Sequence, residues 1–309
     1  MKKYILRRLL WLPVLLFAVS MVTFTLGRVA PGDPVRVMMG ARYNEATAEN
    51  IRDEFGLNRP FFVQYVDYMW GFVRGDFGIS FRFRGRPVRD LVFQKMWVSA
   101  QLAFAAMVVS LSLSLPLGFF IAHKQGRWID PATVTVAVVL SSIPITVLAP
   151  VLLWISCLEL GWFPCSGWGG LIDVRIFVPA IAMGVTGFAG LMRIMRSSTL
   201  DVLGHDFVRT AHAKGLSDVT IVRGHVARNA MIPIITLLAF SLAGLIGGAF
   251  ISERIFGIPG IGSFAIDSIF QRDYPVLMAI TLIGSAAFVF ANLLADVAYA
   301  IVDPRIRYS

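Results

Sequence analysis

Residues 98–122 read VSAQLAFAAMVVSLSLSLPLGFFIA, a run that contains no charged side chain. A hydrocarbon core about 30 Å thick is crossed by roughly 20 apolar residues in helical conformation, so this run is long enough to span a membrane. Lipid offers no partner to a backbone N–H or C=O, and a run this long and uniformly apolar predicts a helix rather than a strand of a barrel. Lipid is therefore the solvent that decides the fold.

Five further apolar runs of similar length flank this one. The whole chain agrees with them, because 57% of its residues are hydrophobic, only 15% are charged and the mean hydropathy is +0.72. A soluble domain of ordinary composition lies far from these values. The sequence predicts an all-α polytopic membrane protein with about six transmembrane helices, at residues 9–29, 98–122, 133–155, 176–194, 232–251 and 276–302.

Lysine and arginine residues set the predicted orientation, since they gather in cytoplasmic connections. The apolar run after Lys2 and Lys3 is longer than the core of a secretory signal and lacks a cleavage site, so we interpret it as a retained first helix. The chain is predicted to lie in the inner membrane, with both termini in the cytoplasm. The sequence predicts four parts: 1–29 (cytoplasmic N-terminus and first helix), 30–97 (extracytoplasmic cap), 98–302 (five-helix transmembrane core with a cytoplasmic loop at 195–230) and 303–309 (cytoplasmic tail).

The net charge of +9 follows from this asymmetry and from anionic lipid at the cytoplasmic surface, so no nucleic-acid partner is needed. Two cysteines, Cys157 and Cys165, lie near a predicted outer connection. They permit a disulfide, and free thiols are the alternative.

The predicted cap contains three local patterns. Residues 45–55 have helical spacing that ends at Gly56. Four aromatic residues from Phe61 to Phe72 recur at helical intervals and lie either at the lipid headgroups or against the transmembrane bundle. Residues 79–84 alternate between apolar and polar, which predicts a short hairpin whose arginines face water, lipid phosphate or a partner.

The longest predicted cytoplasmic connection, residues 193–228, is too long for a simple turn and is rich in helix formers. Phe207, Ala211 and Gly215 recur four residues apart and would give one flat face of small residues, with Gly215 ending a helix and Ser217 capping the next. Such a helix-turn-helix suits contact with a soluble partner. An ordinary interfacial hairpin is the alternative.

Polar residues in or beside the predicted spans are candidates for a gate or pathway, because buried charge is costly in lipid. Asp296 shares a helix face with Asn292 and has either a structural pairing role or a pathway role. Glu253 and Arg254 either pair with each other or help to form an outer gate beside the turn at Pro259 and Gly260.

Signatures of catalysis are missing from the sequence. No lysine follows a glycine, so the chain has no Gly-x4-Gly-Lys phosphate cradle. The four histidines form no zinc-protease motif, and none lies within a predicted span to activate a serine. We therefore expect no catalytic residue, no metal site and no cofactor on this chain.

An ordered set of short motifs runs through nearly the whole sequence. RTAHAKGL at 209–216 is followed by His225, RNA at 228–230 and Pro233. PGDP at 31–34, GDFG at 75–78, FGIPGIG at 256–262, RDYP at 272–275 and DPR at 303–305 complete the set. In this order they resemble the permeases of the dipeptide and oligopeptide family of binding-protein-dependent ABC importers.

The resemblance implies a function for the 195–230 loop, which would couple the chain to a cytoplasmic ATPase. The wider importer loop begins Glu-Ala-Ala, where this chain has Arg209, Thr210 and Ala211, and this leaves open which side chain bonds the ATPase. Ala211, Gly215 and Leu216 carry over best. The coupling residues that it implies are Phe207, Arg209, Thr210, Ala211, Ala213, Lys214, Gly215 and Leu216.

The same resemblance implies partners and a class of cargo. It implies a second, homologous permease, two cytoplasmic ABC ATPases that bind ATP and Mg²⁺, and an extracytoplasmic solute-binding protein. The cargo would be peptides, with glutathione, a nickel chelate or an oligosaccharide as alternatives. A stand-alone membrane channel or an intramembrane enzyme is the alternative function, and the coupling loop disfavours it.

Overall fold

The computed structural model describes residues 2–29, 34–39, 43–54, 56–83, 85–235, 237–238 and 248–302. The side chains of residues 2–12, 28–29, 34, 37–38, 54, 218–219, 223, 291–292 and 294–302 lie outside this description. The described helices are α1 (Lys2–Val29), α2 (Pro34–Met39), α3 (Glu45–Glu54), α4 (Phe61–Val73), α5 (Val88–Ala122), α6 (Ile129–Ser142), α7 (Ile145–Leu153), α8 (Phe177–Leu203), α9 (Asp206–Ala213), α10 (Asp218–Ile221), α11 (Ala227–Ala230), α13 (Phe250–Ile255), α14 (Ile261–Phe270) and α15 (Tyr274–Val302).

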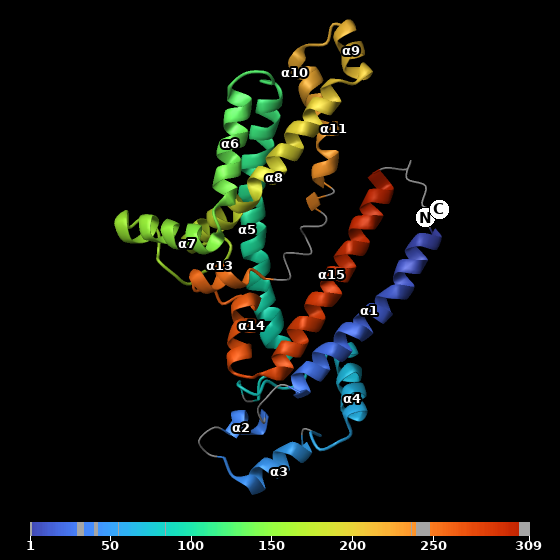
Figure 1. The fold of residues 1–309 in the computed structure, drawn as a ribbon, viewed down its shortest axis with the longest axis vertical. Helices are drawn as coiled ribbons and strands as arrows, with labels where there is room; N and C mark the ends of the chain where they lie inside the picture. Colours follow the sequence, from blue (N-terminus) through green and yellow to red (C-terminus); the bar gives the residue numbers. More distant parts are fainter. Residues whose placement is uncertain are drawn as a thin grey trace.

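The long helices α5 and α8 form the centre of the molecule (Figure 1). They approach closely because their contact faces are small, as glycine and alanine allow between helices in lipid. A Cβ on Gly118 would lie 2.5 Å from the Met192 carbonyl oxygen, and one on Gly184 would lie 2.9 Å from the Ala106 carbonyl oxygen. The buried small residues on α5 recur every four positions: Ala106, Ser110, Ser114 and Gly118.

The described residues contain two helices, α5 and the stretch Val174–Leu203, that are long and apolar enough to cross a membrane. A third would be the pair Ile129–Ser142 and Ile145–Glu159, which is bent by 90°. The predicted span at 133–155 is therefore helical on both sides of a bend, and a single membrane crossing there stays a prediction. Pro144 disfavours the helical conformation at Ile143, whose ψ is 119°, and the chain turns there.

The predicted first and last spans are helical in α1 and α15, which pack against each other (Figure 1). Half of the predicted fifth span, 232–251, falls outside the described residues. The count of six transmembrane helices therefore stays a prediction.

Three of the four aromatic residues that recur along α4, namely Phe61, Tyr65 and Tyr68, pack against α1. Phe24 of α1 is buried and makes edge-to-face contacts with Phe61 and Tyr65, at ring-centroid distances of 5.3 and 5.5 Å. The buried hydroxyl groups of Ser20 and Tyr65 lie 2.6 Å apart and share a hydrogen bond. Of the two alternatives for this aromatic face, packing against the bundle is correct.

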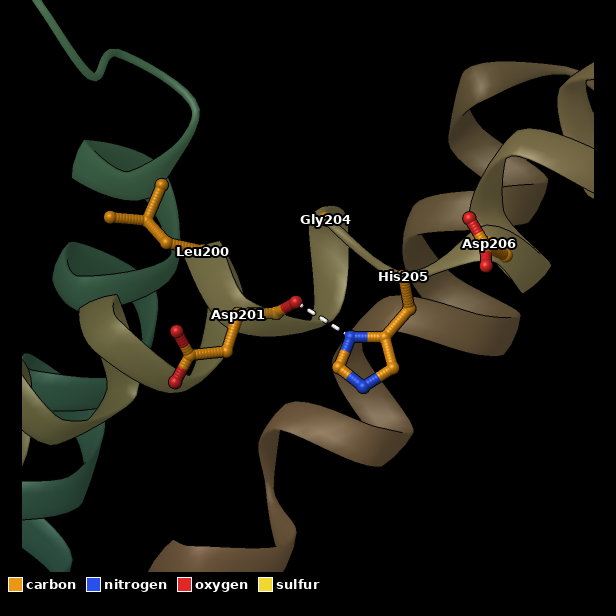
Figure 2. A pocket seen from close by; sticks show the side chains of 5 residues that line it. All are labelled: Leu200, Asp201, Gly204, His205 and Asp206. Carbon is orange, nitrogen blue, oxygen red and sulfur yellow. Dashed lines mark hydrogen bonds between the residues drawn. The ribbon is translucent and has the colours of Figure 1, made fainter.

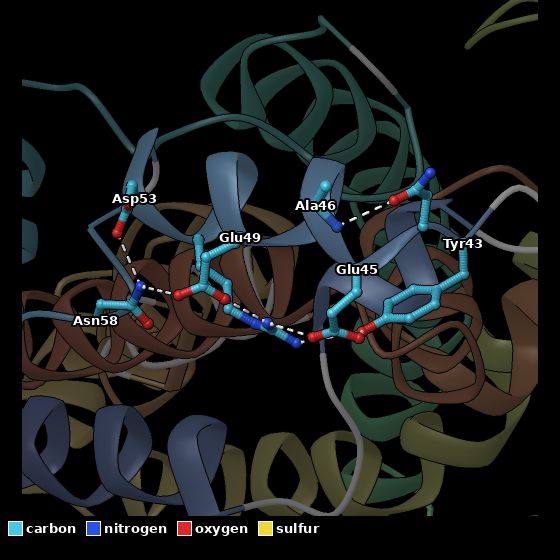
Figure 3. A network of polar contacts seen from close by, with 8 residues as sticks. Tyr43, Glu45, Ala46, Glu49, Asp53 and Asn58 are labelled. Carbon is cyan, nitrogen blue, oxygen red and sulfur yellow. Dashed lines mark hydrogen bonds and ion pairs between the residues drawn. The ribbon is translucent and has the colours of Figure 1, made fainter.

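A polar network holds α3 to its flanking turns (Figure 3). Arg52 contacts Glu45 and Glu49 at 3.1 and 2.8 Å, and Asn58 donates to Glu49 at 3.0 Å. Hydrogen bonds from Tyr43 and then Arg52 hold the pKa of Glu45 below its ordinary value. The helix ends before Gly56, whose φ of 63° confirms the predicted left-handed stop.

The two cysteines are joined as a disulfide, with their Cα atoms 5.2 Å apart. The alternative of free thiols is therefore wrong. The chain after the bridge contacts the turn that follows α13, where the Gly167 N–H donates to the Phe256 carbonyl at 3.2 Å.

Candidate functional site: the α8–α10 elbow

The C-terminal end of α8, together with α9 and α10, forms an elbow at one end of the molecule, opposite α2, α3 and α4 (Figure 1). We use "elbow" for residues 200–221. The central helices α5 and α8 run between the two ends, and the chain of the elbow continues directly from α8. The elbow is thus joined to the bundle through α8 on one side and through residues 222–230 on the other.

A small apolar core makes the elbow rigid. Val208 and Ala211, three residues apart on α9, are buried against Val202 of α8 and Ile221 of α10. Ala211 is only 7% exposed. The expected flat face of Phe207, Ala211 and Gly215 is therefore split, because Ala211 points into the elbow while Phe207 and Gly215 are exposed.

The helix ends as its sequence predicts. Gly215 has φ of 76°, and its N–H donates to the His212 carbonyl at 2.9 Å. The Leu216 N–H donates to the Ala211 carbonyl at 3.3 Å, which completes a Schellman motif. Ser217 then caps α10, since its hydroxyl oxygen accepts from the Thr220 N–H at 3.4 Å.

The outer face of α9 is free to be approached. Its inward positions are Val208 and Ala211, so the positions on the opposite side of the helix are Asp206, Arg209, Thr210 and Ala213, all exposed. Phe207 and Leu216 are about 40% exposed, at 40% and 39%. Six of the eight expected coupling residues thus lie together on the surface with Gly215 beside them: Phe207, Arg209, Thr210, Ala213, Lys214 and Leu216.

A shallow open hollow lies where α8 turns into α9 (Figure 2). His205 is held in it, with Nδ1 2.7 Å from the Asp201 carbonyl oxygen. The side chains of Asp201 and Asp206 give the hollow an acidic lining that suits a basic group of a partner. Sequence reasoning missed this hollow, because Asp201 and His205 lie outside the motif that singled out residues 209–216.

A second missed feature is a bidentate ion pair at the same end of the molecule. Arg196 of α8 donates through Nε and Nη2 to the two carboxylate oxygens of Asp130 at 2.6 and 2.5 Å. Asp130 is buried, and the pair ties the start of α6 to the part of α8 that enters the elbow. The separation of 66 residues left no local pattern by which the sequence could reveal it.

Glu253 and Arg254, expected either to pair or to contribute to a gate, do not pair. Arg254 contacts Asp267 at 2.7 Å on the surface. Glu253 is fully buried and accepts from the Ser99 hydroxyl at 2.6 Å, the Ala249 N–H at 3.1 Å and the Ser263 N–H at 2.9 Å. The predicted ion pair is therefore wrong.

Glu253 instead organises the turn at Pro259 and Gly260. Gly260 precedes α14 and has no side chain to cap it, so distant side chains accept hydrogen bonds from the first N–H groups of the helix. Ser263 N–H binds Glu253, and Ile261 N–H binds the Ser99 hydroxyl at 2.8 Å. A Cβ on Gly260 would overlap the Glu253 carboxyl group. The other gate candidates, the side chains of Asn292 and Asp296, lie outside the described residues.

Comparisons with protein families and with known proteins identify relatives of this chain. Residues 114–308 match the family described as the binding-protein-dependent transport system inner membrane component, and residues 1–112 match the N-terminal part of such a membrane component. A chain of the MetNI methionine ABC transporter, solved in inward-facing conformations, superimposes with a TM-score of 0.50 at 15% identity, over 70% of this chain and 97% of that one. This likeness supports the fold alone.

Three curated relatives align along essentially their whole length. The oligopeptide transport system permease protein AppB of Bacillus subtilis is 37% identical over 100% of both chains. A probable peptide ABC transporter permease, y4tP, of Sinorhizobium fredii is 36% identical over 99% of both. The glutathione transport system permease protein GsiC of Escherichia coli K12 is 36% identical over 100% of both. The chain therefore belongs to the family of inner-membrane permease subunits of binding-protein-dependent ABC transport systems, and is a transporter subunit rather than an enzyme.

Proposed function

We propose that this chain forms half of the translocation pathway of an ATP-driven importer for peptides. The other half is a homologous permease, and two cytoplasmic ABC ATPases that bind ATP and Mg²⁺ drive the cycle. An extracytoplasmic binding protein delivers the cargo. Two of the relatives named above are called peptide or oligopeptide permeases, which supports a peptide cargo, and the name of GsiC makes glutathione, itself a small peptide, the second candidate.

The elbow is the observation that carries this proposal. The elbow is rigid and exposed, and its apolar core contains Val208 and Ala211. Its chain continues directly from α8 at the end of the bundle. A rigid contact of this kind transmits a rigid-body movement, whereas a flexible loop would absorb it. We assign the ATPase contact to the elbow, with a gate at the opposite end near Glu253, Pro259 and Gly260.

Reconstitution tests whether this chain transports peptide only together with its proposed partners and ATP. The chain, a second permease from the same transporter and the two ATPases are assembled in proteoliposomes, with the binding protein and labelled peptide outside. Uptake is expected only when ATP and all components are present, and the purified chain alone is expected to bind no nucleotide. Stoichiometric ATP binding by the isolated chain would overturn the proposal.

The proposed orientation has its own test. It places both termini and the elbow in the cytoplasm, with 30–97 outside, because short connections rich in lysine and arginine stay inside. Single cysteines are introduced at Asn44 and at Asp218 in a background without Cys157 and Cys165. An impermeant maleimide applied to intact cells is expected to label position 44 and to leave position 218 unlabelled until the membrane is opened. The reverse order would show that the chain is inverted.

A further inference from the structure

A short hairpin precedes α5 at the end of the molecule opposite the elbow. We call it the arginine hairpin and define it as residues 78–83 and 85–87. Ile79 and Pro87 form an antiparallel bridge, and the Ser80 N–H donates to the Arg86 carbonyl at 3.2 Å. The hairpin predicted from the alternation of residues 79–84 is thus confirmed.

A buried carboxylate on another part of the chain fixes this hairpin from behind. Asp273, 1% exposed, accepts from the Phe81 N–H at 3.1 Å, from the Arg82 N–H at 3.3 Å and from the Ser80 hydroxyl. Its neighbour Arg272 has φ of 55°, a left-handed conformation that a non-glycine residue rarely adopts. The connection between α14 and α15 is therefore held tightly against the hairpin, which presents a fixed shape.

The outward side of this assembly is cationic and has an apolar centre. Arg82, Arg86, Arg89 and Arg272 are all exposed, and no ion pair joins them to a carboxylate in the described part of the chain. The nearby acids are Asp76, which accepts from the Gly78 N–H, Asp90 in the first turn of α5, and Asp267, which pairs with Arg254. Ile79 and Phe83 are 43% and 40% exposed among these arginines. Arginine around an aromatic residue is typical of protein interfaces.

The depth of the hairpin favours a soluble partner over lipid. Trp97 of α5 is 67% exposed at the start of the uncharged run 98–122, where an aromatic residue marks the membrane interface. From Trp97 to Val88 the helix rises about 14 Å at ~1.5 Å per residue. The headgroup layer on one side of a bilayer is only about 5–8 Å thick. An α5 that runs along the bilayer normal would therefore place the arginine hairpin beyond the lipid phosphates.

We propose that the arginine hairpin, together with Arg272, is the docking surface for an acidic patch on the extracytoplasmic binding protein. The inference rests on the function and orientation proposed above. Opposite charges on the two surfaces speed encounter and fix the docked orientation, and salt weakens their attraction. The docked protein would contact the hairpin, and Asp273 links the hairpin to the connection that leads into α15. This link consists of the hydrogen bonds that Asp273 accepts from Ser80 and from two backbone N–H groups.

The experiment measures binding of the soluble binding protein to the assembled transporter in nanodiscs of zwitterionic lipid. R82E/R86E reverses two charges of the hairpin. R36E/R59E is the matched control, since it makes the same change of charge on α2 and on the connection between α3 and α4. R82K/R86K keeps the charge and changes the shape. Binding is measured at about 50 and 300 mM salt, a range in which the screening length falls from roughly 14 to 6 Å.

We expect R82E/R86E to weaken binding roughly tenfold or more at low salt and to remove most of the salt dependence. R36E/R59E is expected to stay within about twofold of the wild type, and R82K/R86K to lie between them. Equal losses in the two reversal variants would overturn the proposal, because total charge would then be the cause. A loss seen only in nanodiscs that contain anionic lipid would overturn it in favour of headgroup binding.

Binding by the wild-type transporter distinguishes a failure of the docking proposal from a failure of the proposed importer function. If the wild type binds the binding protein and R82E/R86E binds it equally well, only the docking surface is wrong. If the wild type binds no binding protein, the importer assignment itself fails, and the docking surface fails with it.

Discussion

Replacing Ala213 by tryptophan is expected to abolish uptake while leaving the chain in the membrane at its normal abundance. Ala213 is exposed on the face of α9 opposite Val208 and Ala211, so a large side chain there does not disturb the core of the elbow. It would, however, hold a docked ATPase away from a surface that a small residue lets it approach closely. Uptake and co-purification of the ATPases are the measurements.

The control is Gln125→Trp, which places a tryptophan at an exposed position in the connection between α5 and α6, at the same end of the molecule. It is expected to transport normally. Ala211→Trp would be a poor test, because Ala211 is buried and overpacking there costs about 1–3 kcal/mol of folding free energy. Normal uptake by Ala213→Trp would remove the outer face of α9 from the ATPase contact.

Replacing Glu253 by leucine is expected to lower the free energy of unfolding by roughly 3 kcal/mol or more. The change leaves three donors without their acceptor: the buried Ser99 hydroxyl and Ser263 N–H, and the partly buried Ala249 N–H. Each buried donor left without an acceptor lowers the free energy of unfolding by about 1–3 kcal/mol. Thermal unfolding of the purified transporter in one detergent is the measurement.

The adjacent residue provides the control for this change. Arg254→Leu removes an exposed ion pair with Asp267, and such pairs contribute about 0–1 kcal/mol. A stability loss for Glu253→Leu no larger than that for Arg254→Leu would show that the carboxyl group is not needed to begin α14.

Local features of the sequence were enough to predict the ends of helices and the turns between them. The stops at Gly56 and Gly215 and the cap at Ser217 depend on one residue and its immediate neighbours. The apolar runs likewise located α5 and α8, because the length and polarity of a run are properties of the run itself. The motifs of residues 209–216 located the elbow for the same reason.

Partnerships between distant residues could not be predicted. Asp130 with Arg196, Glu253 with Ser99, and Asp273 with Ser80 join positions 66, 154 and 193 residues apart. Proximity in sequence suggested the wrong partner for Glu253, namely Arg254. The angle of the bend before α7, 90°, could not be predicted for a different reason, since mean hydropathy averages over Pro144 and does not register a change of direction.

The cap of α14 also constrains the order in which the chain matures. The ribosome releases Ser99 long before Glu253, so α5 enters the membrane with its hydroxyl group lacking the carboxyl partner that it has in the finished fold. The first turn of α14 is stabilised only after both residues have been made and have met. A nascent chain arrested before residue 253 therefore lacks these hydrogen bonds. Quality-control proteases that recognise incomplete membrane proteins would have this structural difference to detect.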